Sequence, residues 1–505
     1  MIHSQYPSSP RAGKPAIGRL ATPAPRPNAP VPQNPGALLA RHGPFPLRFL
    51  RSERLPAALS QTVRGCHSGP LAVPAPRIPR MSDPYGWQHL RLMQQDPDRF
   101  FRELHRDQGD IARFVLGTDT CWSFAHPHAL QQILTTHWRQ FQKTTRFREV
   151  VSRALGAGLL LAEGAGWQRQ RQAVQPVLNQ AAAPTSPDVL SNGWQTRLDR
   201  WSAVNRIDLD EELRAGWMEQ WLWQLTGLDP TPWVAPLRQS LRGVQSALLR
   251  QLFQVFLPPR WWPWWGRRDE RQALRTFRRL TRELWEQALP GSRYHHLRQT
   301  LTTHGTSATA GLDEARTLLF NGYETTTCGL LWTLWHLARH PLWQDRVVTE
   351  IADQCHSQGP RDSTLLTACW HEALRLHPPA YLLSREVRER VEIAGRSLSA
   401  GDQVFLFLPL PHRDPRAFES PDEFRPERFL HPAAHPTAAG GWLPFGQGPR
   451  GCAGEAWAGQ ICQQLLLPLL RQHRLTVCEE TPEPRPQFGF ALAPAAPVWV
   501  ARAPL

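Results

Sequence analysis

The chain has 505 residues and a formal net charge of +15, and 41% of its residues are hydrophobic, which is enough for a sizeable core. A charge of this size could indicate a nucleic acid or an anionic membrane as the partner. Residues 1–80, however, hold eleven Lys/Arg and a single acid, Glu53, and therefore carry +10 of the +15. The other 425 residues carry only +5, which excludes a strongly basic, nucleic-acid-binding body.

The sequence contains neither a membrane-spanning segment nor a disulfide pattern. No run of about 18 apolar residues occurs, so we expect no transmembrane helix. The eight cysteines show no C-x-x-C spacing, and in a chain of this length they predict neither a disulfide framework nor a zinc site. A reducing compartment is the simpler assumption, and we expect a cytoplasmic protein.

Residues 1–80 differ in composition from the rest, with sixteen prolines and few large apolar side chains before Leu47. Such a segment cannot bury enough surface to offset its ordering entropy, so we expect disorder. It could be a flexible tail, or a transit peptide rich in Arg and Ser whose prolines oppose an amphipathic helix. We favour a third interpretation, a mis-assigned start with Met81 as the true first residue, and place the folded domain at 81–505.

Apolar periodicity predicts an alternation of helices and short strands in the first part of the domain. The expected elements are a helix from Asp96 to Gly109, strands at 111–116 and 120–125, and a helix from His126 to Thr136.

Residues 185–300 are also helical in pattern, and they contain the unusual run Trp261–Trp265 beside several arginines. This composition suits a peripheral membrane contact, the lip of an apolar channel, or the ordinary packing of a proline-broken linker. Residues 301–311 are small and polar and predict a loop. The alternating pattern from Leu475 to Val500 predicts a terminal hairpin.

Trp167 and Arg171 lie four residues apart, so on a helix they share one face. An indole N–H and a guanidinium on one face suit a bound carboxylate. Considered alone, the pair is more simply a surface arginine beside a core tryptophan.

The longest helical pattern runs from Leu312 to Arg339 and contains Gly322, Glu324 and Thr325. Glycine in mid-helix costs about 1 kcal/mol relative to alanine, so it needs a reason. Gly322 would let the helix approach a flat cofactor, a Thr hydroxyl can bend the helix or give a proton, and Glu324 can resupply that proton. The alternative is a core helix with a buried Thr cluster.

Glu372 and Arg375 lie at i, i+3 on a helix that ends before Pro378, and can form a charge-assisted pair. On a surface such a pair would contribute only a few tenths of a kcal/mol. Arg428, in a later proline-containing loop, can complete a three-residue charge network.

The stretch Phe445–Gly454 places Cys452 in a loop with four glycines and Arg450, directly before a helical run. The helix N-terminus favours a thiolate, which could serve as a nucleophile or as a metal ligand. The glycines indicate that something flat and large packs against the loop, and a cysteine-ligated haem fits that description.

The pattern F-G-x-G-x-R-x-C-x-G resembles the haem-binding loop of the cytochrome P450 family, and the segments at Trp167, Gly322 and Glu372 resemble further motifs of that family in the right order. The resemblance covers about residues 81–505. It implies a mainly α-helical cytochrome P450 fold, with a long central distal helix over the haem and a small β-sheet region. The implied cofactor is haem b, iron protoporphyrin IX.

The resemblance also implies a role for each motif residue. Cys452 would be the iron ligand, Glu324 and Thr325 the catalytic proton-delivery pair, and Glu372, Arg375 and Arg428 a structural network. Asn321 departs from the family pattern, which usually has alanine there, and adds a polar group near the oxygen or substrate pocket. The residues expected at the haem are Trp167, Arg171, Gly322, Arg385, Phe445, Arg450, Cys452 and Gly454, with His412 near a propionate.

The implied function is monooxygenation of an apolar small molecule by O2. No flavin-binding or iron–sulfur pattern follows Cys452, so a ferredoxin or flavodoxin-type donor with its reductase would supply the electrons. We expect a monomer that binds no nucleic acid. The alternatives are a peroxide-dependent peroxygenase, which the Glu324–Thr325 pair disfavours, and a haem-binding sensor without enzymatic activity.

Overall fold

The computed structural model describes residues 85–179, 187–201, 203–254, 267–305, 307–355, 362–430, 440–479, 481 and 483–504. The predictions for residues 1–80 and for Trp261–Trp265 lie outside the described residues.

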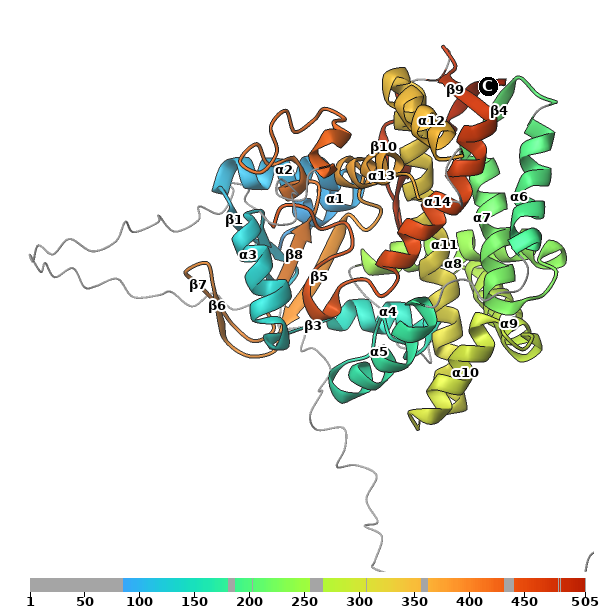
Figure 1. The fold of residues 1–505 in the computed structure, drawn as a ribbon. Coiled ribbons are helices and arrows are strands. Elements are labelled where there is room, and N and C mark those ends of the chain that lie inside the picture. The colour runs from blue at the N-terminus through green and yellow to red at the C-terminus, as the bar shows by residue number, and fades with distance from the viewer. Residues whose placement is uncertain are drawn as a thin grey trace, which may run out of the picture. The chain divides into compact units, whose positions relative to one another are not determined.

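The described chain is mainly α-helical, as the sequence predicted (Figure 1). The helices are α1 (Trp87–Gln95), α2 (Pro97–Gln108), α3 (Pro127–Gln131), α4 (Thr145–Leu155), α5 (Gly164–Asn179), α6 (Pro187–Trp201), α7 (Leu209–Thr226), α8 (Thr231–Leu252), α9 (Arg268–Gln287), α10 (Arg293–Thr303), α11 (Ala308–Arg339), α12 (Pro341–Cys355), α13 (Thr364–Leu376) and α14 (Glu455–Gln472). No helix among the residues described is both long and apolar enough to cross a membrane.

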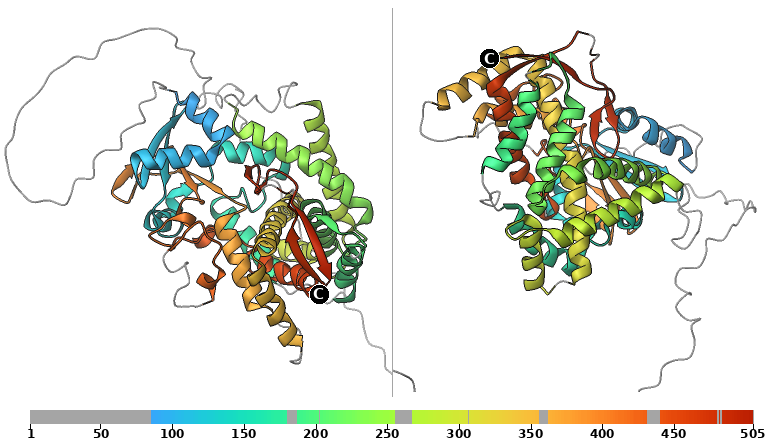
Figure 2. Two further views of the ribbon diagram at one scale, coloured as in Figure 1. Left: turned by 90° about the horizontal axis from the view of Figure 1, so that it is seen from above. Right: turned by 90° about the vertical axis from the view of Figure 1, so that its right-hand side faces the viewer.

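The strands form one five-stranded sheet and three small ones. The strands are β1 (Ile111–Leu116), β2 (Asp119–Phe124), β3 (Phe141–Gln142), β4 (Arg206–Asp208), β5 (Leu382–Val387), β6 (Val391–Ile393), β7 (Arg396–Leu398), β8 (Gln403–Phe407), β9 (His473–Val477), β10 (Pro486–Phe488), β11 (Leu492–Pro494) and β12 (Trp499–Pro504). The large sheet has the order β1-β2-β8-β5-β3, in which only β2 and β8 are parallel. It lies on one side of the body, and α6 to α10 lie on the other (Figures 1 and 2).

Helix α11 crosses the middle of the helical part, and its predicted start was wrong. It begins at Ala308 rather than Leu312, and α10 continues to Thr303, so the loop expected at 301–311 shrinks to residues 304–307. The Ser307 hydroxyl accepts a hydrogen bond from the Ala310 N–H (3.3 Å), which caps α11, and the buried Leu301 anchors the end of α10. Small polar residues are therefore helical here because a cap and a buried contact support them.

The predicted terminal hairpin is present in an elaborated form. Strand β9 pairs antiparallel with β12, and a second small hairpin, β10–β11, lies between them in the sequence. Strand β12 also pairs with β4, so the end of the chain is tied to the segment before α7.

A fully buried ion pair ties α13 to the loops that follow it. Arg375 donates to both carboxylate oxygens of Glu372, at 2.6 and 2.8 Å, and neither side chain has any exposed area. The other Arg375 N–H groups reach the carbonyls of His412, Pro421 and Glu423. Arg428 adds a longer contact to Glu372 (3.3 Å), so the structure brings the three predicted charges together.

His412 extends this network toward the cysteine loop. Its Nδ1 lies 3.0 Å from the Arg375 carbonyl, and its Nε2 accepts from the Leu443 N–H at 2.8 Å. Burial lowers the pKa of His412 to about 3, so the ring is neutral and Nδ1 is the donor. Both ring nitrogens are therefore engaged within the protein, and the expected propionate contact of His412 has no nitrogen left to make it.

The network predicts a large loss of stability when Glu372 is removed. In the Glu372→Ala variant Arg375 remains buried without its counter-charge, which should lower the free energy of unfolding by about 3–5 kcal/mol. Urea unfolding followed by circular dichroism measures this. The matched control is Glu283→Ala, which removes the partner of the largely exposed Arg279 at 2.8 Å and should cost about 0.5 kcal/mol or less. Equal losses in the two variants would contradict the assignment.

Candidate functional site

The loop that carries Cys452 is held in shape by its own backbone and by glycine conformations. The Cys452 N–H donates to the Phe445 carbonyl at 2.8 Å, which closes the loop on itself. Gly446 and Gly448 have φ of 70° and 72°, a region that side chains disfavour. A Cβ on Gly448 would also lie 2.2 Å from the Leu134 carbonyl oxygen. The loop then enters α14 at Glu455.

Cys452 has exposed surface in the described chain, at the point where the loop enters α14. Burial raises the pKa of this thiol, while the Gly454 N–H, 3.4 Å from Sγ, and the charge of Arg171 favour the thiolate. Arg171 also donates to the Gly451 carbonyl at 2.8 Å. Arg171 thus contacts the cysteine loop itself.

Three cations gather beside the loop around one carboxylate. Strand β3 pairs with β5 so that Gln142 opposes Glu386, and Lys143 directly follows β3 while Arg385 directly precedes Glu386 in β5. Arg450 donates to the Ala162 carbonyl at 2.8 Å and forms a salt bridge with Glu163. Lys143, Glu163, Arg385 and Arg450 line one small cavity together with the apolar side chains of β3 and the preceding turns.

Like charges that are buried near one another disfavour each other's charged forms. Burial, followed by Arg385 and Arg450, holds the pKa of Lys143 well below its usual range. Burial and Arg450 also lower the pKa of Arg385 to about 10. Glu163 is the one acid that offsets these charges, so the group has an excess of positive charge that a bound dianion would balance.

Trp167 completes this corner. The Arg450 guanidinium carbon lies 4.2 Å from the centre of the Trp167 ring, a cation–π contact. Trp167 and Arg171 therefore both reach the cysteine loop from α5, but through different partners.

Sequence reasoning missed Lys143 and Glu163. A signal was available for the first, because Lys143 and Lys14 are the only lysines in a chain that otherwise uses arginine. Glu163 has no local motif, and only the fold brings it to Arg450.

Helix α11 carries the predicted motif. Asn321, Gly322, Glu324 and Thr325 are partly exposed on a helix that is otherwise almost wholly buried there. The Thr325 hydroxyl donates to the Asn321 carbonyl at 2.6 Å, so its oxygen remains available as an acceptor.

Glu324 is held by side chains from two other helices. Arg214 of α7 donates to Glu324 Oε1 at 2.8 Å, and Gln245 of α8 donates to Oε2 at 3.3 Å. Arg214 also contacts both oxygens of Asp210, at 2.8 and 2.9 Å. The acid of the predicted pair is thus charge-balanced and fixed in place, which the sequence motif did not indicate.

Gly322 is required by a tryptophan. A Cβ at this position would lie 2.6 Å from the Trp221 ring, and Trp217 donates its indole N–H to the Gly322 carbonyl at 2.9 Å. The missing side chain of Gly322 therefore faces α7, whereas we expected it to face a cofactor.

The loop before α5 connects the two sides of the site. At one end Asp313 of α11 accepts the Ala157 N–H (2.9 Å), and a Cβ on Gly158 would lie 2.1 Å from the Thr317 hydroxyl. At the other end Ala162 and Glu163 bind Arg450.

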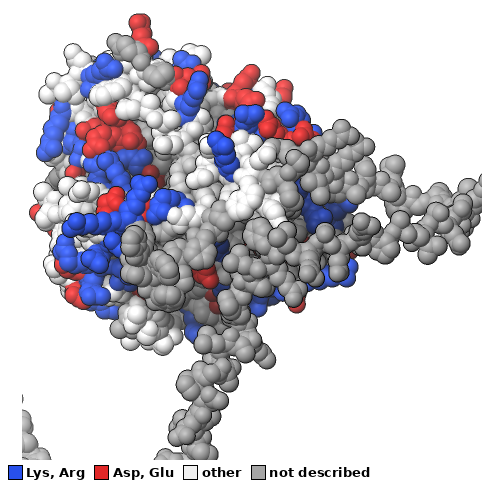
Figure 3. Space-filling model, turned by 180° about the vertical axis from the view of Figure 1, so that it is seen from behind, with Lys and Arg blue, Asp and Glu red and all other residues white. Residues whose placement is uncertain are grey.

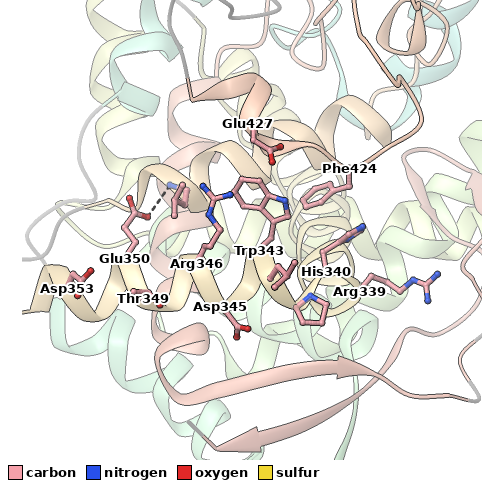
Figure 4. Close-up of a pocket in the computed structure, with 13 residues that line it drawn as sticks. Arg339, His340, Trp343, Asp345, Arg346, Thr349, Glu350, Asp353, Phe424 and Glu427 are labelled. Atoms are coloured by element: carbon pink, nitrogen blue, oxygen red, sulfur yellow. Dashed lines mark hydrogen bonds between the residues drawn. The ribbon is translucent and has the colours of Figure 1, made fainter.

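A larger groove, of about 1080 Å³, lies along α12 and is shown in Figure 4. Several of its polar groups are already engaged. Glu350 accepts the Leu365 N–H at 3.1 Å, at the start of α13. Asp345 forms a salt bridge with Arg474 at 2.6 Å. Arg346 stacks on the Trp343 ring at 4.1 Å. We assign it a structural role.

Basic and acidic side chains are interspersed on the face of the body shown in Figure 3. This face offers no broad field of a single sign to a polyanion.

Comparison with known proteins agrees with this geometry. The family description "Cytochrome P450" matches residues 278–499. The chain is 28% identical to cyclooctatin synthase of Streptomyces melanosporofaciens over 80% of this chain and 92% of that protein. It is 26% identical to cyclooctat-9-en-7-ol 5-monooxygenase of the same organism, over 73% and 83% of the two chains. It is also 36% identical to cytochrome P450 4d2 of Drosophila melanogaster over 36% and 38%.

The family match includes Cys452, the Glu372–Arg375 pair and the Gly322–Thr325 segment, and the bacterial relatives extend the likeness over most of the described body. Residues 278–499 thus match the cytochrome P450 family, and the chain is similar to members of that family over most of its length.

Proposed function

We propose that this cytochrome P450 oxidises a cyclic, hydrocarbon-like substrate with O2, and that Cys452 is the iron ligand. The carrying observation is the Cys452 thiol, which has accessible surface in a loop shaped by glycines and held by Arg171. As a family member the chain binds haem b and is a haem-thiolate monooxygenase.

The charges beside the cysteine fit this cofactor. Haem b carries two propionates, and Lys143, Arg385 and Arg450 with the single acid Glu163 form a group that lacks about two negative charges. Buried like charges of this kind are costly unless counter-charges accompany them. We assign Lys143, Arg385 and Arg450 to the propionates, and Arg171 to the backbone of the cysteine loop.

The haem supplies the activation of O2, and its thiolate ligand favours cleavage of the O–O bond. The residues of this chain hold the ligand and manage protons. Gly454 donates to the sulfur, and this contact favours the thiolate form that an iron ligand needs. The Thr325 oxygen offers an acceptor beside the reaction site, because its own proton is given to the Asn321 carbonyl.

Glu324 would resupply protons to this side of the site. Arg214 and Gln245 hold its carboxylate, and Asp210, about one-third exposed, connects Arg214 to the surface. A carboxylate held in this way can be reloaded from solvent only when the Arg214 contact loosens. This arrangement supports monooxygenation rather than the use of peroxide, which would bring its own protons.

The bacterial relatives support the proposed substrate class, because one of them is named for a cyclic alkenol, cyclooctat-9-en-7-ol. Family members generally take their electrons from redox partners, and we propose a ferredoxin or flavodoxin-type donor for this one. We further propose a monomeric, cytoplasmic enzyme, a location suggested by the free cysteines of the described chain.

The reduced-CO difference spectrum tests the ligand. The wild type should show the red-shifted band of a thiolate-bound haem, and Cys452→Ser should lose it while keeping its far-ultraviolet circular dichroism. The control Cys462→Ser changes a buried cysteine on α14 and should retain the band. A Cys452→Ser protein that kept the band would end the assignment.

Lys143→Met should weaken the retention of haem, because one charge-assisted hydrogen bond to the cofactor is lost. Such bonds contribute about 1.5–3 kcal/mol, so transfer of haem to apomyoglobin should become at least about ten-fold faster. The control is Arg139→Met, which removes an exposed cation that stacks on Trp138 at 4.8 Å. Unchanged transfer in Lys143→Met would remove this lysine from the cofactor site.

Glu324→Gln should slow turnover driven by O2 and reduced ferredoxin by about 10²-fold, the usual contribution of a general acid. Turnover driven by peroxide should change much less, because peroxide supplies its own protons. Any probe compound that shifts the ferric spin state can serve as substrate, and the CO band confirms intact haem. If the variant slowed both reactions equally, Glu324 would have a structural role; efficient peroxide turnover by a wild type inactive with ferredoxin would indicate a peroxygenase.

A further inference from the structure

Asn321 is the residue at which the α11 motif departs from its usual form, and the structure gives its side chain a definite orientation. Asn321 lies one turn before Thr325, so both side chains project from the same face of the helix. Its side chain is half-buried, in contrast to the residues before it from Asp313 to Phe320, all of which are buried. Asn321 is therefore the first residue after this buried run that has accessible surface.

One hydrogen bond fixes which end of the carboxamide faces the site. Asn321 Nδ2 lies 2.9 Å from the Thr317 carbonyl oxygen, and only the amide nitrogen can donate to a carbonyl. The side-chain oxygen must therefore point away from this contact. No residue that the structure describes donates a hydrogen bond to Asn321 Oδ1.

An amide oxygen can only accept, so a ligand beside it must bring a donor or leave it unsatisfied at a cost. The nearest hydroxyl of the helix, on Thr325, already gives its proton to the Asn321 backbone carbonyl at 2.6 Å. Both carboxylate oxygens of Glu324 already accept hydrogen bonds, from Arg214 at 2.8 Å and from Gln245 at 3.3 Å, so Glu324 is engaged within the protein. The chemistry favours a neutral O–H group.

We propose that Asn321 Oδ1 accepts a hydrogen bond from a hydroxyl group of the substrate, so that the enzyme acts on an alcohol. This inference rests on the proposed function and adds to it the substrate's polar group. It also places the enzyme after a reaction that installs a hydroxyl on the hydrocarbon skeleton. Asn321 is here a specificity-determining residue, whereas Thr325 and Glu324 manage protons.

Imidazoles with an N-alkyl arm test the proposal without knowledge of the substrate. Such compounds bind the haem iron of the holoenzyme directly, and the red shift of the Soret band gives their dissociation constants. The arms vary in length and end in a hydroxyl, a methoxy or a methyl group. At the arm length that reaches Asn321, the wild type should bind the hydroxyl form about 5- to 10-fold more tightly than the other two, as expected for one neutral hydrogen bond.

In Asn321→Ala this preference for hydroxyl over methoxy should disappear, while affinity for the methyl arm is kept or improved. The control is Thr327→Val, which removes a similar side-chain bond to the helix backbone (Tyr323 carbonyl, 2.9 Å) at a fully buried position. Its preference should equal that of the wild type. A wild type with no hydroxyl preference at any arm length, or a preference that survives in Asn321→Ala, would overturn the proposal.

The proposed function and the role of Asn321 can be refuted by different results. Loss of the hydroxyl preference with a normal CO band leaves the haem-thiolate function intact and removes only the role of Asn321. A wild type that shows neither the CO band nor an imidazole shift would refute the proposed function and, with it, this inference.

Discussion

The position of the cysteine depends on a charge pair that is itself far from water. Glu372 and Arg375 have no exposed area, and every N–H of the Arg375 guanidinium has an acceptor. A buried pair of this kind contributes little net stability compared with apolar packing, but its geometry is demanding. Here that geometry fixes His412, because Arg375 donates to the His412 carbonyl and accepts from the His412 ring at its own carbonyl. The other ring nitrogen of His412 accepts the Leu443 N–H. Leu443 in turn accepts from Gly446 at 2.9 Å, at the start of the cysteine loop.

Charges are balanced differently around α11 and around the cysteine loop. On the α11 side, each charge has a partner of the opposite sign, as with Glu324 and Arg214. On the cysteine side, Lys143, Arg385 and Arg450 are placed against one another with too little negative charge. The first arrangement is complete within the protein. The second is complete only with an anionic cofactor, so cofactor binding and the order of this corner are coupled.

Local patterns predicted those parts of the structure that local physics determines. The long helix, the cysteine loop and the Glu372–Arg375 spacing all depend on residues within one or two turns of each other, and the structure has them as expected. The start of α11 was missed because a cap at Ser307 and a buried leucine outweigh a composition typical of loops. The reason for glycine at position 322 was predicted wrongly, because the Trp221 ring that packs against Gly322 is about a hundred residues away in the sequence.

Separation in the sequence also explains why some residues of the site were not predicted. Arg214 reaches Glu324 across 110 residues, and Arg450 reaches Glu163 across 287, so no spacing rule could join them. His412 was associated with the right region but with the wrong partner, because its proximity to the cofactor segment could be inferred and its two hydrogen bonds could not.

The scarcity of lysine has a practical consequence for the study of this protein. Lys143 is the only lysine among the described residues, and burial, followed by Arg385 and Arg450, lowers the pKa of its amine. An acylating reagent directed at amines therefore has a single side-chain target in the described body, and we propose that bound haem would shield it. The mass of one labelled peptide would report how much of a preparation is loaded with haem, without any optical measurement.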